Sequence, residues 1–559
     1  MIMNAEPTQT LDPNNLPDDL ALLKSLISVL IAEAQKQKLE NDKLRHQLYI
    51  QINHRFGRRS ESISPDQMAL FQQLIEERLA DIPKVAVPEP PTKGPARPHG
   101  RRKPPENLPT RTVHYPLPED MKLCPECDGP LKKFGVEPRI QINWVPASIF
   151  KDEQVAEKWC CPACQDVVVT SPLPPLPIKR GMAGAGLLAH IAVSKYADHI
   201  PLSRQAGMLS RHGFEVNDST LGGWMGQLVE LVEPIVAEMK VEVLKSKVIH
   251  SDDTPVAVLE ERPIKPPGAD VAEKPEFTPK THKKARQGRL WVYVGDKEHP
   301  YSVYDYSPNR EGRHPADFLG AWNGYFQVDA YGGYDALFDA KKAKGHVIEV
   351  ACLAHVRRYF EKALPVDSLR GQTALAFIQE LYKIEKSARD VDTKARREIR
   401  EKHARPILEK FKAWIDEQAP FVLPKSAMGE AFVYAGNQWK ALVTYLDDGD
   451  LTIDNNISER ALRSVAVGRN NWGKFGTDEG GRWAAVLYSV IASCKQHSID
   501  PFAYLNDVIP KIGDARTAGK ISDLLPVAWA GTQAAAKVDA LATPPATALQ
   551  APAGILTAA

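Results

Sequence analysis

The sequence predicts a multidomain α/β protein with a mixed-sheet core and a helical insertion. From residue 246, four short runs rich in β-branched and aromatic residues precede a fifth, "GHVIEVACLAHVRRYF", which leads from a strand into a helix. Between the third and fourth runs, "HPADFLGAW" is typical of a short helix. Three strands, a helix, a strand, a helix and a strand is the element order of the ribonuclease-H-like fold. At 559 residues the chain is also too long for one core.

Composition excludes several classes of protein. Hydrophobic residues at 43% and charged residues at 25% are ordinary for a globular protein, and the net charge of +1 favours no partner by itself. No apolar run approaches the roughly 18 residues that a membrane span requires. The first residues, "MIMNAEPTQTLDPNN", lack the form of a signal peptide. We therefore expect a cytoplasmic protein that does not contact a membrane.

Residues 1–82 are predicted to form an N-terminal helix or coiled coil with a basic end. Over 19–52, steps of four and three residues give a heptad seam with a polar residue at one a-type position. The seam consists of Leu23, Ile27, Leu30, Ala34, Gln37, Asn41, Leu44 and Leu48. This pattern favours self-association, and the alternative is an amphipathic helix packed on its own chain. "HRFGRRSES" follows, and we expect Arg58 and Arg59 to bind DNA.

The next two segments are predicted to be a linker and a zinc ribbon. Residues 83–118 are proline-rich and basic, so "GRRKPP" would lie along phosphates or in a minor groove, or simply be solvated. Residues 119–172 contain "CPEC" and "WCCPAC". Two such knuckles complete a tetrahedral four-sulfur shell for structural Zn²⁺. The ligands would be Cys124, Cys127, Cys161 and Cys164, with Cys160 as a rival for Cys161 and a redox pair as the alternative.

The remaining domain boundaries follow from composition and periodicity. Residues 173–243 have a helix-turn-helix outline, with a turn at Gly213 and a second helix capped near Asp218 or Ser219, which indicates a DNA-binding domain or a plain helical pair. The catalytic core is expected at 244–364 and 451–529, interrupted by a helical, charge-rich insertion at 365–450. The Ala/Pro-rich tail, 530–559, is expected to be disordered.

Three acidic residues in separate elements form a candidate metal site. Asp252 lies in the first strand, Asp329 ends the fourth, and Glu459 lies one turn into a later helix. In the predicted fold the two strands are neighbours. Converging carboxylates repel one another, and oxygen ligands suit Mg²⁺, with Mn²⁺ as a substitute. Two such ions would support in-line phosphoryl transfer. Asp253 is the nearest rival to Asp252 but points to the opposite face; Asp335, Asp447 and Asp448 are weaker rivals.

The stretch "DNNISERALRSVAVGRNNWGKFG" permits two interpretations of Glu459. Asn456 and Glu459 have the spacing of a capping box, which would make the glutamate structural. Alternatively it completes the acidic site, and Arg463, Arg469 and Lys474 bind substrate phosphates. Arg463 would otherwise form a helical ion pair with Glu459. A second basic run, His355, Arg357 and Arg358, would reach scissile phosphates or only pack at a helix start, and we leave it unassigned.

These residues resemble a known family. "HSDDTPVAVL", "YFQVDAYGGYDALF", "ACLAHVRRYF" and the "DNNISERALR" block are similar to the transposases of the insertion-sequence 66 family. The resemblance implies a DDE transposase with a ribonuclease-H-like core, and places Asp252, Asp329 and Glu459 on its catalytic triad.

That resemblance also implies partners. The protein would bind the terminal inverted repeats of its element and target DNA as double strands, and would cleave and transfer strands with Mg²⁺ or Mn²⁺. We expect a homo-oligomer at least on DNA, and accessory proteins of the same element are possible partners. The alternatives are a ribonuclease-H-like nuclease or resolvase without strand transfer, and a catalytically inactive DNA-binding regulator.

Overall fold

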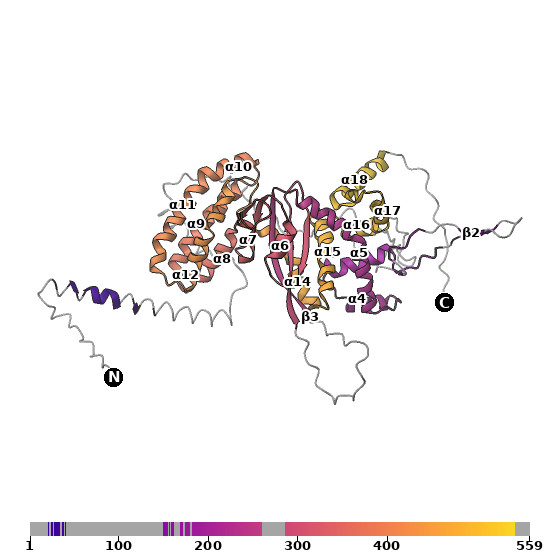
Figure 1. Cartoon of the computed structure of the whole chain (residues 1–559), viewed down its shortest axis with the longest axis horizontal. Helices are drawn as coiled ribbons and strands as arrows, with labels where there is room; N and C mark the ends of the chain where they lie inside the picture. Colours follow the sequence, from indigo (N-terminus) through magenta and orange to yellow (C-terminus); the bar gives the residue numbers. More distant parts are fainter. Residues whose placement is uncertain are drawn as a thin grey trace, which may run out of the picture. The chain divides into compact units, whose positions relative to one another are not determined.

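The computed structural model describes residues 181–259 and 285–542, together with parts of 21–40 and of 149–178 (Figure 1). The chain divides into two compact units, residues 88–171 and the remainder. In the smaller unit, β1 (Lys158–Cys160) pairs antiparallel with β2 (Val168–Thr170). Arg58, Arg59, the four predicted zinc ligands and the linker lie outside the described residues. Described positions between 21 and 40 are helical, and the coiled coil stays a prediction.

A six-stranded mixed sheet organises the larger unit. Its strands are β3 (Val248–Leu259), β4 (Ala285–Val294), β5 (Ser302–Ser307), β6 (Gly324–Gln327), β7 (Val347–Val350) and β8 (Lys474–Phe475). The spatial order is β5-β4-β3-β6-β7, and β8 pairs with β3. Strands β3, β4 and β5 are antiparallel, whereas β6 and β7 run parallel to β3. The predicted mixed α/β architecture and the adjacency of the first and fourth strands are therefore present.

Short helices connect the strands in the predicted order. Helix α6 (Arg313–Leu319) follows β5, and the 3-10 turn η2 (Gly332–Tyr334) with α7 (Asp335–Phe338) separates β6 from β7. Helix α8 (Leu353–Ala363) follows β7. The parallel pairing of β6 with β3 places Gln327 opposite His250, so the end of β6 lies close to the part of β3 that carries one predicted carboxylate.

One group of helices shares the apolar core of the sheet. It contains α3 (Ala185–Tyr196), α4 (Leu202–Arg211), α5 (Asp218–Val243), α14 (Asn456–Trp472), α15 (Asp478–Gln496), α16 (Pro501–Val508) and α17 (Ile512–Thr517). Leu228, Val232, Ile235 and Met239 of α5 are fully buried. The segment 173–243, predicted as a domain of its own, therefore packs into the same core as the sheet. Asn217 caps α5, accepting a hydrogen bond from the Thr220 backbone N–H at 2.8 Å.

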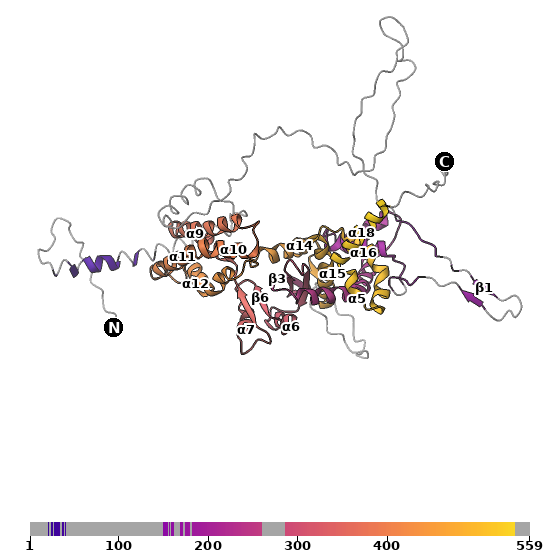
Figure 2. The same ribbon diagram turned by 90° about the horizontal axis from the view of Figure 1, so that it is seen from above.

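The insertion forms a second helical core on the other side of the sheet (Figures 1 and 2). It consists of α9 (Ser368–Ser387), α10 (Thr393–Ile399), the π-helical η3 (Arg400–Ala404), α11 (Arg405–Gln418), η4 (Ala419–Phe421), α12 (Ala427–Asn437), α13 (Trp439–Val443) and η5 (Thr444–Leu446). Aromatic rings fill it: Phe411 stacks on Phe377 at 5.1 Å and on Trp414 at 6.1 Å between ring centroids. Helix α8 packs against this bundle.

The C-terminal part differs from the prediction at one point. The 3-10 turns η6 (Ile509–Lys511) and η7 (Ile521–Leu524) lead to α18 (Pro526–Ala542). This helix continues into the segment that we predicted to be disordered from residue 530. Its alanines have the highest helix propensity of all residues, which explains the extension. Among the described helices, none combines the length and apolarity that crossing a membrane requires.

Candidate active site

Asp252 lies in the middle of β3, paired with Val292 of β4. Its Oδ1 accepts a hydrogen bond from the backbone N–H of Asp253 at 2.7 Å. Burial, together with the negative charges of Asp329, Asp253 and Glu459, raises the pKa of Asp252 to about 7. The three predicted carboxylates, which are far apart in the sequence, therefore lie within electrostatic reach of one another.

Asp329 follows the end of β6, which runs parallel to β3. Its Oδ2 lies 3.6 Å from Nη2 of Arg310, and its Oδ1 is buried without a hydrogen-bond partner. Burial raises the pKa of Asp329 even though Arg310 and His355 oppose the shift. A buried carboxylate oxygen with no donor is costly, so this position favours a cation.

Glu459 is held by a cation from another helix. Nη1 and Nη2 of Arg358 on α8 donate to its two oxygens at 2.9 and 2.7 Å, and Nε2 of His355 lies 3.7 Å away. The N-cap of α14 is Asn455, not Asn456, and its side chain makes no capping hydrogen bond. The capping-box interpretation is therefore wrong, because the glutamate points toward α8 and not toward the start of its own helix.

Asn455 instead connects the elements that carry the acidic residues. Its fully buried side chain donates to the Ser251 carbonyl at 2.8 Å, and its Oδ1 lies 3.2 Å from Nδ1 of His250. Its backbone N–H donates to Sγ of Cys352, the residue before α8, at 3.1 Å. The amide thus fixes α14 against β3 and α8. Its position within "DNN" was visible in the sequence, but its partners depend on tertiary packing.

A second set of hydrogen bonds joins β6 to the segment before α14. The side-chain amide of Gln327 donates to the carbonyls of Thr452 at 2.6 Å and Asp454 at 3.2 Å. The Thr452 hydroxyl donates to the Gln327 side-chain oxygen at 2.9 Å. Because Gln327 is buried and only two residues before Asp329, this contact fixes the aspartate relative to the glutamate helix.

Asp253, the rival of Asp252, is neutralised by arginines. Its carboxylate has no exposed surface and accepts from Nη1 of Arg289 at 3.0 Å and from Nη2 of Arg310 at 2.6 Å. The Arg310 guanidinium also stacks over the ring of Tyr331, 3.7 Å from its centroid. Sequence reasoning missed both arginines, since neither belongs to a motif. The structure places Asp253 in a paired cluster and Asp252 beside the other acidic residues.

The predicted phosphate-binding residues of α14 and β8 fall into two groups. Arg463 and Lys474 are exposed. Arg469 instead donates to Oγ1 of Thr254 at 2.8 Å and to the Pro255 carbonyl at 2.9 Å. It anchors the end of α14 on β3, just before Gly473, whose φ of 76° ends the helix and lets the chain enter β8. Arg463 does not provide the cation that holds Glu459, since Arg358 does.

The residues fit a divalent cation only in part. Asp252 and Asp329 provide carboxylate oxygens in a partly buried place, and Oδ1 of Asp329 is unpartnered, which suits a hard cation. Both oxygens of Glu459 are taken by Arg358. Consistent with this, in the part of the chain that the structure describes, no three His, Cys, Asp or Glu residues gather closely enough to hold a metal ion.

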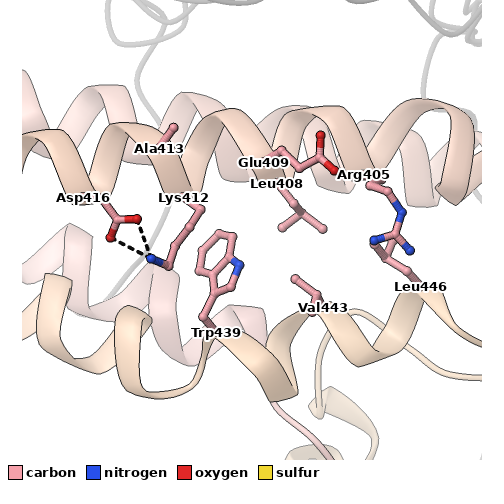
Figure 3. A pocket seen from close by; sticks show the side chains of 9 residues that line it. All are labelled: Arg405, Leu408, Glu409, Lys412, Ala413, Asp416, Trp439, Val443 and Leu446. Atoms are coloured by element: carbon pink, nitrogen blue, oxygen red, sulfur yellow. Dashed lines mark hydrogen bonds and ion pairs between the residues drawn. The ribbon is translucent and has the colours of Figure 1, made fainter.

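A pocket of about 410 Å³ lies elsewhere, in the insertion between α11 and α13 (Figure 3). Leu408, Trp439, Val443 and Leu446 give it an apolar lining. At its edge Lys412 pairs with Asp416 at 2.6 Å. None of the three predicted carboxylates lines it, so it is not part of the acidic site.

Comparison with known proteins identifies the family. The model of the transposase IS66 family matches residues 180–483, the IS66 C-terminal element matches 489–527, and the model described as transposase C of IS166 homeodomain matches 43–113. The first match covers more than half of the chain and contains all three predicted carboxylates. The chain belongs to the transposase IS66 family.

Similar proteins occur in Sinorhizobium fredii. The uncharacterized protein y4jD is 28% identical over 536 residues, which is 93% of this chain and 98% of the relative. The uncharacterized protein y4hP is 28% identical over 455 residues, covering 76% and 78%. A chain in the crystal structure of the Mos1 strand transfer complex matches 49% of this chain and 80% of its own at 10% identity, with a TM-score of 0.12. A score this low does not establish a common fold.

Proposed function

We propose that the chain is a DDE transposase of a bacterial insertion sequence, which cleaves DNA at the ends of its element and transfers the strands to target DNA. Membership of the transposase IS66 family supports this. The observation that carries it is the arrangement of three carboxylates: Asp252 lies on β3, Asp329 follows the adjacent β6, and Glu459 lies on α14. The charges of Asp329 and Glu459 both raise the pKa of Asp252. The order β5-β4-β3-β6-β7, with three antiparallel and two parallel strands, supports a ribonuclease-H-like core.

In this proposal Asp252 and Asp329 hold Mg²⁺ or Mn²⁺, and Glu459 joins them when Arg358 releases it. Bound divalent ions would activate a water or a 3′-hydroxyl and stabilise the leaving oxygen. The protein contributes two partly buried aspartates, of which Asp329 has an oxygen without a hydrogen-bond partner, as oxygen ligands for the cation. Asn455 and Gln327 keep the three carboxylate-bearing elements in register.

Phosphate binding is assigned to exposed basic residues. Arg463 and Lys474 lie on the segment that begins with Glu459, so DNA along α14 would reach the acidic site. We add Arg58 and Arg59, the basic linker and the zinc ribbon as further DNA contacts. At the helix-turn-helix outline the exposed start of α5, Asp218–Thr220, has no basic residue, so we give α5 no phosphate-binding role.

A transposase must hold two element ends together, and we therefore infer a homo-oligomer on DNA, working in the cytoplasm. Binding of terminal inverted repeats should weaken steeply with salt, because several phosphates are neutralised at once.

The test is joining of labelled element ends to a plasmid in Mg²⁺. Asp252→Asn, Asp329→Asn and Glu459→Gln should each lower cleavage and joining by about a thousandfold or more while binding of the ends is retained. The matched control is Asp317→Asn, an exposed aspartate of α6, which should keep full activity.

Each other outcome selects a different function. Cleavage without joining would indicate a nuclease or resolvase. Binding with neither reaction in the unmodified protein would indicate a regulator. Strand transfer by any of the three carboxamide variants would contradict the assignment of the acidic residues.

A further inference from the structure

Arg358 connects the two cores at the acidic site. It lies on α8, which packs in the core of the insertion, whereas Glu459 lies on α14, which packs on the sheet. Its guanidinium binds both carboxylate oxygens, at 2.9 and 2.7 Å. Two parallel charge-assisted hydrogen bonds are the strongest geometry that this pair of groups can adopt.

The same contact conflicts with metal binding. A divalent cation that uses the three acidic residues needs an oxygen of Glu459, and Arg358 already neutralises that carboxylate. The aspartates differ, since Oδ1 of Asp329 is buried without a partner. A cation could therefore bind the carboxylates of Asp252 and Asp329 directly, whereas the carboxylate of Glu459 is already bound by Arg358.

We propose that Arg358 is a positioning residue that holds Glu459 in the metal-free protein and competes with the divalent cation for it. When a cation and DNA bind together, the guanidinium leaves the carboxylate and pairs with a substrate phosphate. The DNA part of this inference rests on the proposed function. The competition with the cation does not.

The geometry permits the exchange. The Arg358 side chain is 37% exposed and that of Glu459 is 24% exposed, so the pair lies at the surface of the site and not within a core. A planar guanidinium binds phosphate and carboxylate with the same two-pronged geometry. Exchanging one anion for the other therefore leaves no buried charge unpaired.

The simpler alternative is a fixed ion pair that only ties α8 to α14. That role predicts that removing Arg358 loosens the acidic site and weakens cation binding. Competition predicts the opposite sign, which makes the two roles separable without any activity measurement.

The experiment is a calorimetric titration of Mn²⁺ into the full chain without DNA. Arg358→Gln should bind Mn²⁺ about fivefold more tightly or better, because the competing cation is gone. Arg358→Lys, which keeps the charge but not the two-pronged geometry, should show a smaller gain and serves if the glutamine variant does not fold. The matched control is Arg357→Gln, since Arg357 pairs with Glu361 along the same helix and should leave Mn²⁺ affinity unchanged.

A double variant identifies the partner. Adding Glu459→Gln to Arg358→Gln should remove the gain, because the released carboxylate is then absent. Unchanged or weaker Mn²⁺ binding in both Arg358 variants, or no Mn²⁺ binding in any form, would overturn the competition.

The DNA step and the proposed function fail in different ways. If Arg358→Gln binds Mn²⁺ more tightly but cleaves DNA as fast as the unmodified protein, the phosphate role is wrong and the competition stands. If Mn²⁺ binding is tighter and the unmodified protein neither cleaves nor joins DNA, the proposed function fails. If strand transfer occurs and Mn²⁺ affinity does not change, only this inference fails.

Discussion

The two aspartates at the sheet and the glutamate on α14 are stabilised by the protein in two different ways. Asp252 and Asp329 are partly buried beside like charges, and burial raises both pKa values. Glu459 is matched by an arginine that binds both of its oxygens. The aspartate side of the site therefore stores unfavourable electrostatic energy, whereas the glutamate side is electrostatically satisfied.

The difference follows from what holds each residue. The main-chain hydrogen bonds of β3 to β4 and to β6 fix the aspartates, so the sheet can keep them in a place that their charge disfavours. Glu459 lies on α14, which packs on the sheet, and its cationic partner Arg358 lies on α8, which packs in the core of the insertion. The hydrogen bonds of the sheet therefore determine where the two aspartates lie, whereas the environment of Glu459 depends on how the insertion packs.

The largest effect is expected where the insertion holds the segment that leads to Glu459. The Arg400 side chain is 1% exposed, binds both oxygens of Glu385, and donates to the carbonyls of Tyr445, Asp448 and Leu451 at 2.9 Å. Arg400→Met should lower the free energy of unfolding of the insertion by about 3–5 kcal/mol, because it leaves a partly buried carboxylate and three carbonyls unpaired. Urea denaturation followed by tryptophan fluorescence measures it.

Two further variants control this prediction. Arg397→Met removes an exposed arginine from the preceding turn and should change stability by less than about 0.5 kcal/mol. The double variant Arg400→Met with Glu385→Met should recover much of the loss, because apolar packing replaces the ion pair. A loss below about 1 kcal/mol in the single variant would mean that Arg400 does not support the glutamate side.

The comparison itself is tested by removing one charge from each side. In metal-free buffer Asp329→Asn should stabilise the protein by about 1 kcal/mol, because it removes a buried charge with an unpartnered oxygen. Glu459→Gln should destabilise it by about 1 kcal/mol, because Arg358 loses its partner, and the partial exposure of that pair keeps the effect small. Thermal unfolding in a chelating buffer gives both signs.

Asp317→Asn, at an exposed position, should shift the melting temperature in neither direction. If Asp329→Asn and Glu459→Gln shift the melting temperature in the same direction, the distinction between the aspartates and the glutamate is wrong.

Sequence patterns predicted the sheet and its acidic residues for physical reasons. The period of two and the β-branched residues identify the strands, and the element order places β6 beside β3. Which cation meets which anion depends on contacts across more than 100 residues, such as Arg358 with Glu459, and no local pattern records them. Arg469 illustrates the same limit: its charge predicted a phosphate contact, but its position on α14 directs it to the Pro255 carbonyl.

The smallest effect concerns a carboxylate outside the acidic site. Burial, with the nearby charge of Asp335, raises the pKa of Glu349 on β7 from 4.5 to about 7. The Glu349 carboxyl group therefore stays protonated to a higher pH in the folded protein than in the unfolded chain. The stability that this protonation contributes is fully present below about pH 4.5 and is lost as the pH rises through 7. Glu349→Gln should then be the more stable form at pH 8, with the difference shrinking toward pH 5.

The whole pKa shift corresponds to at most about 3 kcal/mol, and partial exposure reduces the expected difference to about 1 kcal/mol. Melting temperatures of the two proteins at pH 5 and pH 8 measure it, and Glu398→Gln, at an exposed position of α10, should show no pH-dependent difference. An equal difference at both pH values would contradict the prediction. If the dependence is found, an uncompensated carboxylate is a property of the parallel half of the sheet, where Asp329 follows β6 and Glu349 lies on β7. The unfavourable charge at Asp329 would then come from how this half of the sheet is buried, and not from the acidic neighbours alone.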